Sequence, residues 1–326
     1  MNKPGQHGAA LLAAMLTVTM VATLAAAALW QQWRNVEVEA AERSRVQSAW
    51  ILNGALDWAR LILREDRGNV DHLGEPWAVP LQEARLSTFL AADQSNNSDT
   101  GDANNVFLSG DMTDLQSRLD IHVLHTAAGR NDKGVEAFGR LFEALGLPQS
   151  QLAQLAENIR FAADIGIDNR SASRAPLMPQ RVGQLVWLGL SPETVAALEP
   201  YVTVIPVPET GQGPAVKVNL NTAPAEVIYA VGSKISLADA RKLVAQRERQ
   251  PFRSMTDVTP LLPAEGGFVD GMAGLNSTFF EIRGRLRIDD VVIEERSIVQ
   301  RSGSSVRILR RERGASESLS QAAVRR

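Results

Sequence analysis

The sequence contains no cysteine, and only 5% of its 326 residues are aromatic. The lack of cysteine excludes a disulfide framework, a Cys-ligated zinc site, an iron–sulfur cluster and a cysteine nucleophile. The formal net charge is −3, so the composition gives no basic domain that would predict a nucleic-acid partner. The sequence also has no nucleophile elbow, Walker loop or zincin helix, and we therefore predict that the chain is not an enzyme.

Charge is also missing from one long stretch near the amino terminus. Residues 8–33 include no charged side chain, and residues 9–30 are mostly Ala, Leu, Met and Val. A helix of roughly 22 residues rises about 33 Å, which matches the hydrocarbon core of a bilayer. The helical pattern continues without proline as far as Leu61. We therefore expect one helix of about fifty residues, half of it in lipid and half amphipathic.

Three kinds of amino-terminal segment fit this pattern. The stretch is an uncleaved signal anchor, a secretory signal cleaved within the alanines at 25–28, or a helix that follows a short leader ending at Gly8. Its length exceeds the usual 7–15 residues of a secretory h-region, which disfavours the second alternative. The third resembles the type IV prepilin leader, in which prepilin peptidase cuts after the glycine. The mature protein would then begin at Ala9 and keep the whole apolar helix.

The remainder of the chain changes from short helices to strands. Between residues 135 and 262, helices are expected to end at Gly146 and Gly189 and to begin at Ser191 and Ser236. Alternating residues at 279–288, 291–295 and 306–309 predict an antiparallel meander. Residues 106–123 predict a strand pair around a turn at Gly110-Asp111 or Asp114. Since such a sheet must bury one face, we expect the long helix to pack on it, with the helical region inserted between the first and last parts of an α+β fold.

The most distinctive string is KVNLNTAPAEVI at residues 217–228, which contains Asn219 and Asn221. With the following residues it looks like a helix–hairpin–helix module, a type that often binds DNA phosphates through outward backbone N–H groups of a glycine-flanked hairpin. In such modules the hairpin reads roughly Gly-Ile-Gly, whereas here its place is taken by VGSKI at residues 231–235. The loss of the second glycine weakens such a phosphate site. The nearby cations fit a solvated helix face better than a DNA surface: Lys234, Arg241, Lys242, Arg247 and Arg249. A membrane-anchored DNA-binding protein of the competence type stays open as the alternative function.

Taken together, these features resemble the minor pseudopilin K family of type II secretion systems, also called general secretion pathway protein K. The resemblance rests on the leader string at residues 8–12, on Asp57-Trp58, on residues 71–78 and on the string at 219–224. It implies an α+β fold with a pilin-like long helix on an antiparallel sheet and a large all-α insert of the helix–hairpin–helix or SAM-like kind. The implied segments are a leader (1–8), a transmembrane part (9–33), a pilin-like domain (34–130 and 275–311), the insert (131–274) and a disordered tail (312–326).

The same resemblance implies a function in assembly. A family member is processed and methylated after cleavage by prepilin peptidase, and spans the inner membrane of a Gram-negative bacterium once, with its C-terminal domain in the periplasm. It is expected to form the tip of the pseudopilus with the minor pseudopilins I and J and other pseudopilins, and to support export of folded proteins across the outer membrane. No nucleic-acid partner is expected.

One position departs from the general pilin pattern. Ordinary pilins and pseudopilins carry glutamate at the fifth mature residue, where this sequence has Ala13. In the family that carboxylate is thought to meet the amine of a neighbouring subunit, which offsets the cost of a charge at bilayer depth. A subunit without it lacks this contact with a subunit already in place. Ala13 is therefore predicted to define a position at the end of the fibre.

The resemblance also implies calcium in the helical domain. Asp164 and Asp168 follow a predicted helix and are the candidate ligands, against the alternative of a plain helix-end turn. Calcium requires several oxygen ligands, usually with carboxylates in one loop. The loop that contains Asp93, Asp99 and Asp102 is more acidic, but its spacing fits no EF-hand.

Histidine is scarce, with four residues in the chain. His122 and His125 are three positions apart in a segment predicted to be a strand. Because side chains alternate along a strand, the two rings are expected to face opposite sides and not to share a metal.

Overall fold

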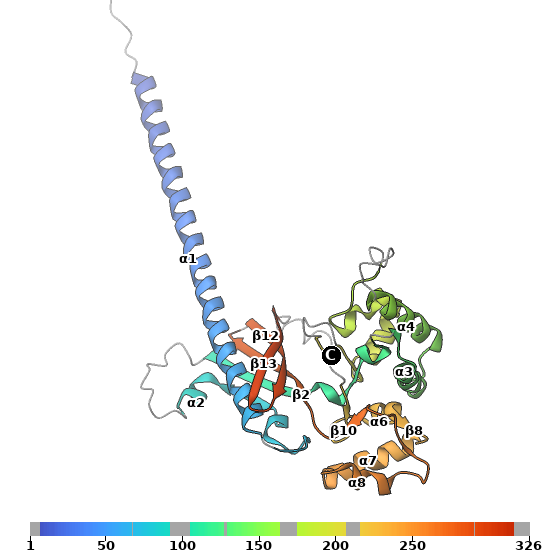
Figure 1. The fold of residues 1–326 in the computed structure, drawn as a ribbon. Helices are drawn as coiled ribbons and strands as arrows, with labels where there is room; N and C mark the ends of the chain where they lie inside the picture. The colour runs from blue at the N-terminus through green and yellow to red at the C-terminus, as the bar shows by residue number, and fades with distance from the viewer. Residues whose placement is uncertain are drawn as a thin grey trace, which may run out of the picture. The chain divides into compact units, whose positions relative to one another are not determined.

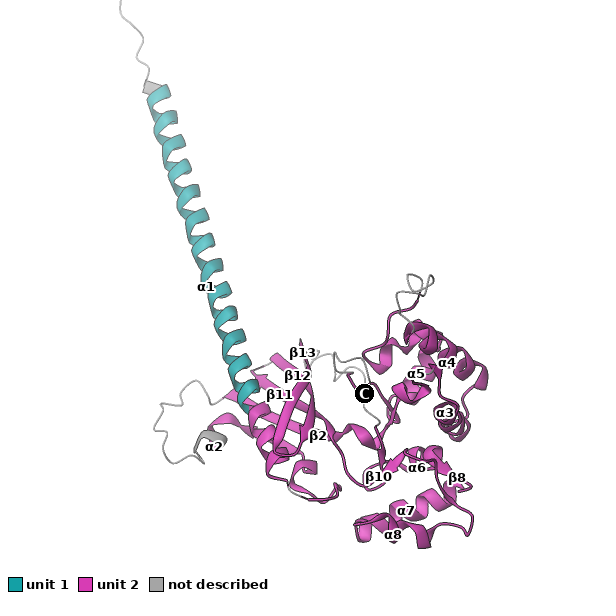
Figure 2. Ribbon diagram, viewed as in Figure 1, with its two compact units in different colours: residues 1–54 teal, residues 55–326 magenta. Residues whose placement is uncertain are grey.

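The computed structural model describes residues 7–66, 68–91, 105–126, 129–163, 175–206, 216–289 and 291–315. The chain divides into two compact units, residues 1–54 and 55–326, which Figure 2 colours separately. Helix α1 (His7–Glu65) contributes to both units.

The first unit consists of the amino-terminal part of α1, a helix of 59 residues. By length and composition this helix can cross a membrane. Thr17, Thr19 and Thr23 each donate a hydroxyl hydrogen bond of 2.9 Å to the carbonyl three residues earlier. These polar groups are therefore satisfied within the helix, as hydrocarbon surroundings require. The prediction of one long apolar amino-terminal helix is confirmed.

The second unit contains a five-stranded antiparallel sheet in the order β1-β2-β11-β12-β13. The predicted carboxy-terminal meander is confirmed as β11, β12 and β13. Asp289 (φ 49°) and Gly303 (φ 57°) lie in its two connections, where tight hairpin turns need positive φ. The strands are β1 (Leu81–Arg85), β2 (Val106–Asp114), β11 (Phe279–Ile288), β12 (Val291–Ser302) and β13 (Ser305–Ala315).

Strand β2 differs from the predicted strand pair. It continues unbroken through Gly110 and Asp111, so the turn predicted there was wrong. The strand ends at the alternative position, Asp114, where a 3-10 turn follows, but the next strand does not pair with β2. Gly110 faces Gly284 of β11, and a Cβ at Gly110 would lie 2.6 Å from the carbonyl oxygen of Arg283. The glycine therefore permits close approach of two strands and does not serve a turn.

Strand β13 extends further than predicted. Glu312 pairs with Arg296 of β12, and its carboxylate accepts a hydrogen bond of 2.9 Å from Arg181. The predicted disordered tail at 312–326 is therefore wrong for residues 312–315, and residues 316–326 lie outside the described residues.

The last turns of α1 pack on one face of this sheet. Leu56, Ala59 and Leu63 are buried beside Trp77, whose ring meets Phe280 edge-on at 5.1 Å. The guanidinium of Arg60 donates to the carbonyl of Val306 at 2.7 Å. The expectation that the helix covers the sheet is met, and the sheet residues of the cluster are Phe280, Ile282, Val299 and Val306.

We call residues 115–278 the helical insert, because the chain leaves the sheet after β2 and returns at β11, its neighbour in the sheet (Figure 1). The predicted caps are confirmed at Ser191 and Ser236, whose hydroxyls accept from backbone N–H groups three residues later, and at Gly189, which is left-handed. The main helices are α3 (Asp132–Ala144), α4 (Gln149–Ala163), α5 (Pro192–Leu198), α6 (Ala225–Val231), α7 (Leu237–Arg249) and α8 (Met255–Val258).

Short elements complete the chain. They include α2 (Leu86–Ala91), the 3-10 helices η1 (Pro76–Ala78), η3 (Leu115–Ser117), η4 (Ile121–Leu124), η6 (Val182–Leu188) and η7 (Thr259–Leu261), and the two-residue strands β3 (Leu119–Asp120), β4 (His125–Thr126), β5 (Gly129–Arg130), β6 (Val202–Thr203), β7 (Val218–Asn219), β8 (Gly232–Ser233), β9 (Gly267–Phe268) and β10 (Ala273–Gly274).

The insert has its own hydrophobic core. Phe138, Leu141 and Phe142 of α3 are fully buried in it together with side chains from the other helices. Leu119 and Leu124 belong to the same core although they precede residue 131, where the insert was expected to begin.

Candidate functional sites: the amino-terminal helix and a buried polar junction

The residues predicted to control processing and tip position lie at the start of α1. Gly8, Ala9 and Ala13 are all helical, and the side chains of Ala9 and Ala13 are exposed in the first unit. Leu11 and Leu12 beside them are also exposed, by 65% and 70%. The apolar surface of this part of the helix is thus available to lipid or to another helix. Asp164 and Asp168, the predicted calcium ligands, lie outside the described residues.

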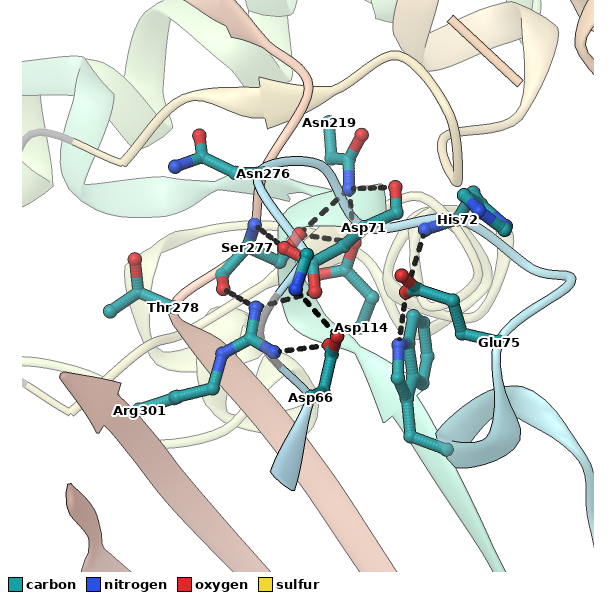
Figure 3. A network of polar contacts seen from close by, with 12 residues as sticks. Asp66, Asp71, His72, Glu75, Asp114, Asn219, Asn276, Ser277, Thr278 and Arg301 are labelled. Carbon is teal, nitrogen blue, oxygen red and sulfur yellow. Dashed lines mark hydrogen bonds and ion pairs between the residues drawn. The ribbon is translucent and has the colours of Figure 1, made fainter. Parts of the chain in front are cut away.

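A buried polar network lies where the insert meets the sheet (Figure 3). We call it the polar junction and define it by Asp71, Asp114, Asn219, Ser277 and Arg301. It joins the loop after α1, the end of β2, strand β7 of the insert, the segment just before β11 and the end of β12. Segments more than 200 positions apart in sequence meet here, as in the hydrogen bond from the Ser277 N–H to Asp71.

Asp114 is the centre of the junction and is 2% exposed. Its Oδ2 accepts hydrogen bonds from the hydroxyls of Ser277 (2.6 Å) and Thr222 (2.5 Å) and from the amide of Asn219 (3.2 Å). Its Oδ1 accepts from the backbone N–H of Gln116 at 2.7 Å. Burial raises the pKa of Asp114, and these four donors oppose that shift. Three donors thus share Oδ2 and one bonds to Oδ1, so both oxygens of this buried carboxyl group are hydrogen-bonded within the protein.

The cost of burying the Asp71 carboxylate is offset differently, by an ion pair with Arg301. The guanidinium bonds to the Asp71 carboxylate, to the carbonyl of Ser277 at 2.8 Å and to Asp66 at 2.6 Å. Asp71 is 1% exposed, and burial raises its pKa to about 6 despite the Ser277 N–H and Arg301, which lower it. Asp71 is therefore a buried acid that titrates close to neutrality.

The distinctive string at 219–223 supplies the insert's side of the junction. The Asn219 amide donates to the carbonyl of Asp71 (3.1 Å) and to the hydroxyl of Ser277 (2.9 Å). Asn221 exchanges two hydrogen bonds of 2.9 Å with the backbone of Phe252. The string thus ties the insert to the sheet through Asn219 and orders the segment after α7 through Asn221. Its asparagines have a structural use that needs no nucleic acid.

Gln116 closes the junction from the side of the insert. Its amide donates to the carbonyls of Lys217 (2.8 Å) and Asn276 (3.3 Å), and its oxygen accepts from the N–H of Thr278 at 2.6 Å. The chain leaving β2 is therefore bonded to the chain entering β11.

Three carboxylates beside the junction form the acidic group that most resembles a metal site among the described residues. Ligand atoms of Asp66, Asp71 and Glu75 lie within 4.8 Å of one another. Arg301 already neutralises the first two, and Glu75 accepts from the indole N–H of Trp77 at 2.6 Å. Calcium requires six to eight oxygens, and at this place it would meet a guanidinium. The group does not fit a calcium site, because Arg301 is its cation.

An open cavity of about 690 Å³ borders the same side chains. Its lining includes Asp66, Asp71, Ser277 and Arg301, together with the turn at 302–304. The arginine side of the junction is therefore next to solvent, while Asp114 is enclosed.

The connection between α6 and α7 does not present a phosphate site. Strand β8 pairs with β9, and the guanidinium of Arg140 donates to the carbonyls of Gly232 and Ile235. Lys234 forms an ion pair of 2.8 Å with Glu265, and the buried Arg247 donates to the carbonyl of Leu220 at 2.6 Å. Gly232 and Ile235 of this connection are buried, whereas the Lys234–Glu265 ion pair lies at the surface.

The arrangement of helix and sheet indicates the structural class of the protein. A long apolar amino-terminal helix whose later turns pack on a small antiparallel sheet is the arrangement of pilin-like subunits. The described chain adds a helical insert between adjacent strands of that sheet.

Comparison with known proteins then gives the family. Residues 117–207 and 218–276 match two sequence profiles described as type II secretion system (T2SS), protein K. The type II secretion system protein K of Pseudomonas aeruginosa is 24% identical over 336 residues, which cover 95% of this chain and 93% of that protein. The protein K of Pectobacterium carotovorum subsp. carotovorum is 25% identical over 333 residues, covering 95% and 97%.

A solved structure has the same fold. The crystal structure of the GspK–GspI–GspJ complex from the enterotoxigenic Escherichia coli type 2 secretion system aligns with a TM-score of 0.57 at 15% identity, covering 85% of this chain and 99% of that chain. The chain belongs to the type II secretion system protein K family. Members of that family are structural pseudopilins, which confirms the prediction that the chain is not an enzyme.

The raised pKa of Asp71 predicts a specific pH dependence. The folded chain holds a proton on this group up to about pH 6, whereas the unfolded chain releases it near 3.8. The free energy of unfolding should therefore fall by about 2 kcal/mol from this group as pH rises from 4 to 6. Urea titrations across this range should show a fall in wild type that is larger by this amount than the fall in Asp71→Asn.

The control for this measurement is Asp270→Asn, because the Asp270 side chain is 94% exposed. That variant should keep the pH slope of wild type. Equal slopes for wild type and Asp71→Asn would contradict the assignment.

Proposed function

We propose that this protein is a minor pseudopilin at the tip of a type II secretion pseudopilus, where it supports export of folded proteins across the outer membrane. It would span the inner membrane once, with residues 55–326 in the periplasm. The observation that carries the proposal is the change along α1, which is apolar and exposed at its start and packs on a sheet at its end. The apolar part of such a helix can lie in the lipid bilayer before the subunit joins the pseudopilus, and can pack against the helices of other subunits afterwards.

Partners of the same kind are the other minor pseudopilins, I and J. The solved relative was crystallised as a complex with GspI and GspJ. The first unit exposes Val46 and Trp50, by 53% and 72%, and the second unit exposes Trp58 and Leu61, by 50% and 42%. Each pair lies about one helical turn apart on α1. Exposed aromatic side chains are enriched at protein interfaces.

Processing after Gly8 by prepilin peptidase, with methylation of the new terminus, is part of this proposal. Mass spectrometry of the protein purified from a secreting Gram-negative host should give a mature chain that begins at Ala9. Gly8→Val should block the cleavage because the added side chain occupies the cut site, and Gly5→Val in the leader should not. A chain that begins at Met1, or near Ala28, would show instead a plain anchor or a secreted protein.

Ala13 is proposed to restrict the subunit to the tip. Without a carboxylate here, the subunit lacks the contact that pilin-like helices make with the amine of a subunit already in the fibre. The large helical insert would also be difficult to accommodate within a helical shaft.

Ala13→Glu should relax this restriction. A glutamate at bilayer depth costs about 3 kcal/mol unless it is paired, so the variant should seek a neighbouring amine. Immunogold labelling of overproduced pseudopili should then show the subunit along the fibre, and secretion should fall. Ala14→Glu is the matched control, because it adds the same charge about 100° around the helix. Tip-only labelling with normal secretion in Ala13→Glu would rule out this role.

Calcium in the helical insert is proposed from the resemblance to the family, with Asp164 and Asp168 among its ligands. The two aspartates follow α4 in the sequence. When bound, calcium would supply charge neutralisation and cross-linking of oxygen ligands.

A stability measurement tests the calcium proposal. Calcium at 100 times its dissociation constant should stabilise the detergent-solubilised chain by about 2.7 kcal/mol. Asp164→Asn and Asp168→Asn should remove the rise in melting temperature, and Asp93→Asn should keep it. An equal calcium response in all variants would place the ion elsewhere, and no response in wild type would remove the proposal.

A further inference from the structure

His122 lies in the short 3-10 helix η4 (Ile121–Leu124), and His125 follows this helix as the first residue of β4. The whole segment was predicted to be a strand, but the 3-10 turn brings the two rings close together. The ring centroids of His122 and His125 are 6.0 Å apart and the ring planes are tilted by 54°. The reason for excluding a shared metal, opposite faces of a strand, therefore does not hold.

His122 is oriented by a carboxylate. Its Nδ1 lies 3.0 Å from Asp120 Oδ1 and 3.3 Å from Oδ2. The His122 side chain is 9% exposed and that of Asp120 is 2% exposed, and the N–H of Ile205 holds Asp120 at 3.3 Å. A carboxylate on Nδ1 keeps the proton on that nitrogen and leaves the lone pair of Nε2 free for a ligand.

His125 has the complementary property of an unsatisfied nitrogen. Its Nδ1 is buried and, among the described residues, has no hydrogen-bond partner. Burial lowers the pKa of His125, the neighbouring His122 lowers it further and Asp120 opposes the shift. The ring is therefore neutral at pH 7, which is the form of imidazole that binds metal ions.

We propose that His122 and His125 bind one divalent transition-metal ion of the zinc, copper and nickel class, with Asp120 as the positioning residue of His122. Two imidazoles on one such ion, at metal–nitrogen distances of about 2.0–2.1 Å, place their ring centres about 5 to 6 Å apart. The observed separation agrees with this spacing. Imidazole ligands select these ions over calcium, so the site is separate in chemistry from the calcium proposal.

The location gives the ion a structural effect. Ile121 and Leu124 of the same 3-10 helix are buried in the core of the insert. An ion between the two rings would hold this turn closed and so stabilise the part of the insert that follows β2. The inference is independent of the secretion function.

Zinc binding to the chelator-treated full-length chain in detergent tests the proposal. Competition with a chromophoric chelator should show one zinc per chain, and zinc should raise the melting temperature. His122→Gln and His125→Gln should each weaken zinc binding at least tenfold. His72→Gln is the matched control and should bind zinc as wild type does, because His72 lies outside this pair.

Zinc binding that survives in the double variant, that is lost in Asp66→Asn instead, or that is absent from wild type would overturn the proposal. If the histidine variants fail to fold, X-ray absorption of zinc-loaded wild type gives the answer. Two imidazole nitrogens in the zinc shell support the site, and a shell with one or no imidazole overturns it.

Discussion

The buried carboxylate of Asp114 is the interaction on which the relation between sheet and insert depends. Among the described residues its hydrogen-bond donors are neutral, and all of them belong to the insert: Gln116 directly after β2, Asn219 and Thr222 near β7, and Ser277 just before β11. An unpaired buried charge is costly, so the carboxylate is tolerated only while all of these segments are in place. The junction therefore favours a single arrangement of three segments that the sequence keeps far apart.

The two buried acids of the polar junction, Asp114 and Asp71, are stabilised in different ways. Asp114 lies in the enclosed part and relies on neutral donors, whereas Asp71 lies beside the cavity and relies on Arg301. Arg301 also contacts Asp66, the residue after the end of α1, and its guanidinium lies 5.0 Å from the ring centre of Phe280. One arginine thus connects the end of the helix, the sheet and the return of the insert.

Local signals predicted local structure well. The hydroxyl caps, the helix-ending Gly189 and the alternating strands are set by neighbours within four residues, and these predictions agree with the structure. The family resemblance was sound because its motifs are also short strings. Gly110 was misread because glycine serves both turns and close strand contacts, and only the partner Gly284 separates the two.

The polar junction could not be predicted in the same way. Asn219 stood out in the sequence, but its partners Asp71, Asp114 and Ser277 are 58 to 148 positions away. The role of Arg301 could not be predicted from the sequence, because arginine in a strand is usually a solvent-exposed surface residue. The local structure at His122 was also mispredicted, because a 3-10 turn and a short strand have similar composition while they orient side chains differently.

The ends of the insert have a consequence for how such a protein can vary in size. Asp114 and Phe280 are direct partners across β2 and β11, so the whole insert closes a loop between two adjacent strands. The entropy lost in closing a loop grows only with the logarithm of its length. A long insert therefore makes the free energy of pairing between β2 and β11 only slightly less favourable than a short insert does, provided that the insert has its own hydrophobic core. The sheet can thus carry inserts of very different lengths without a change in its own register.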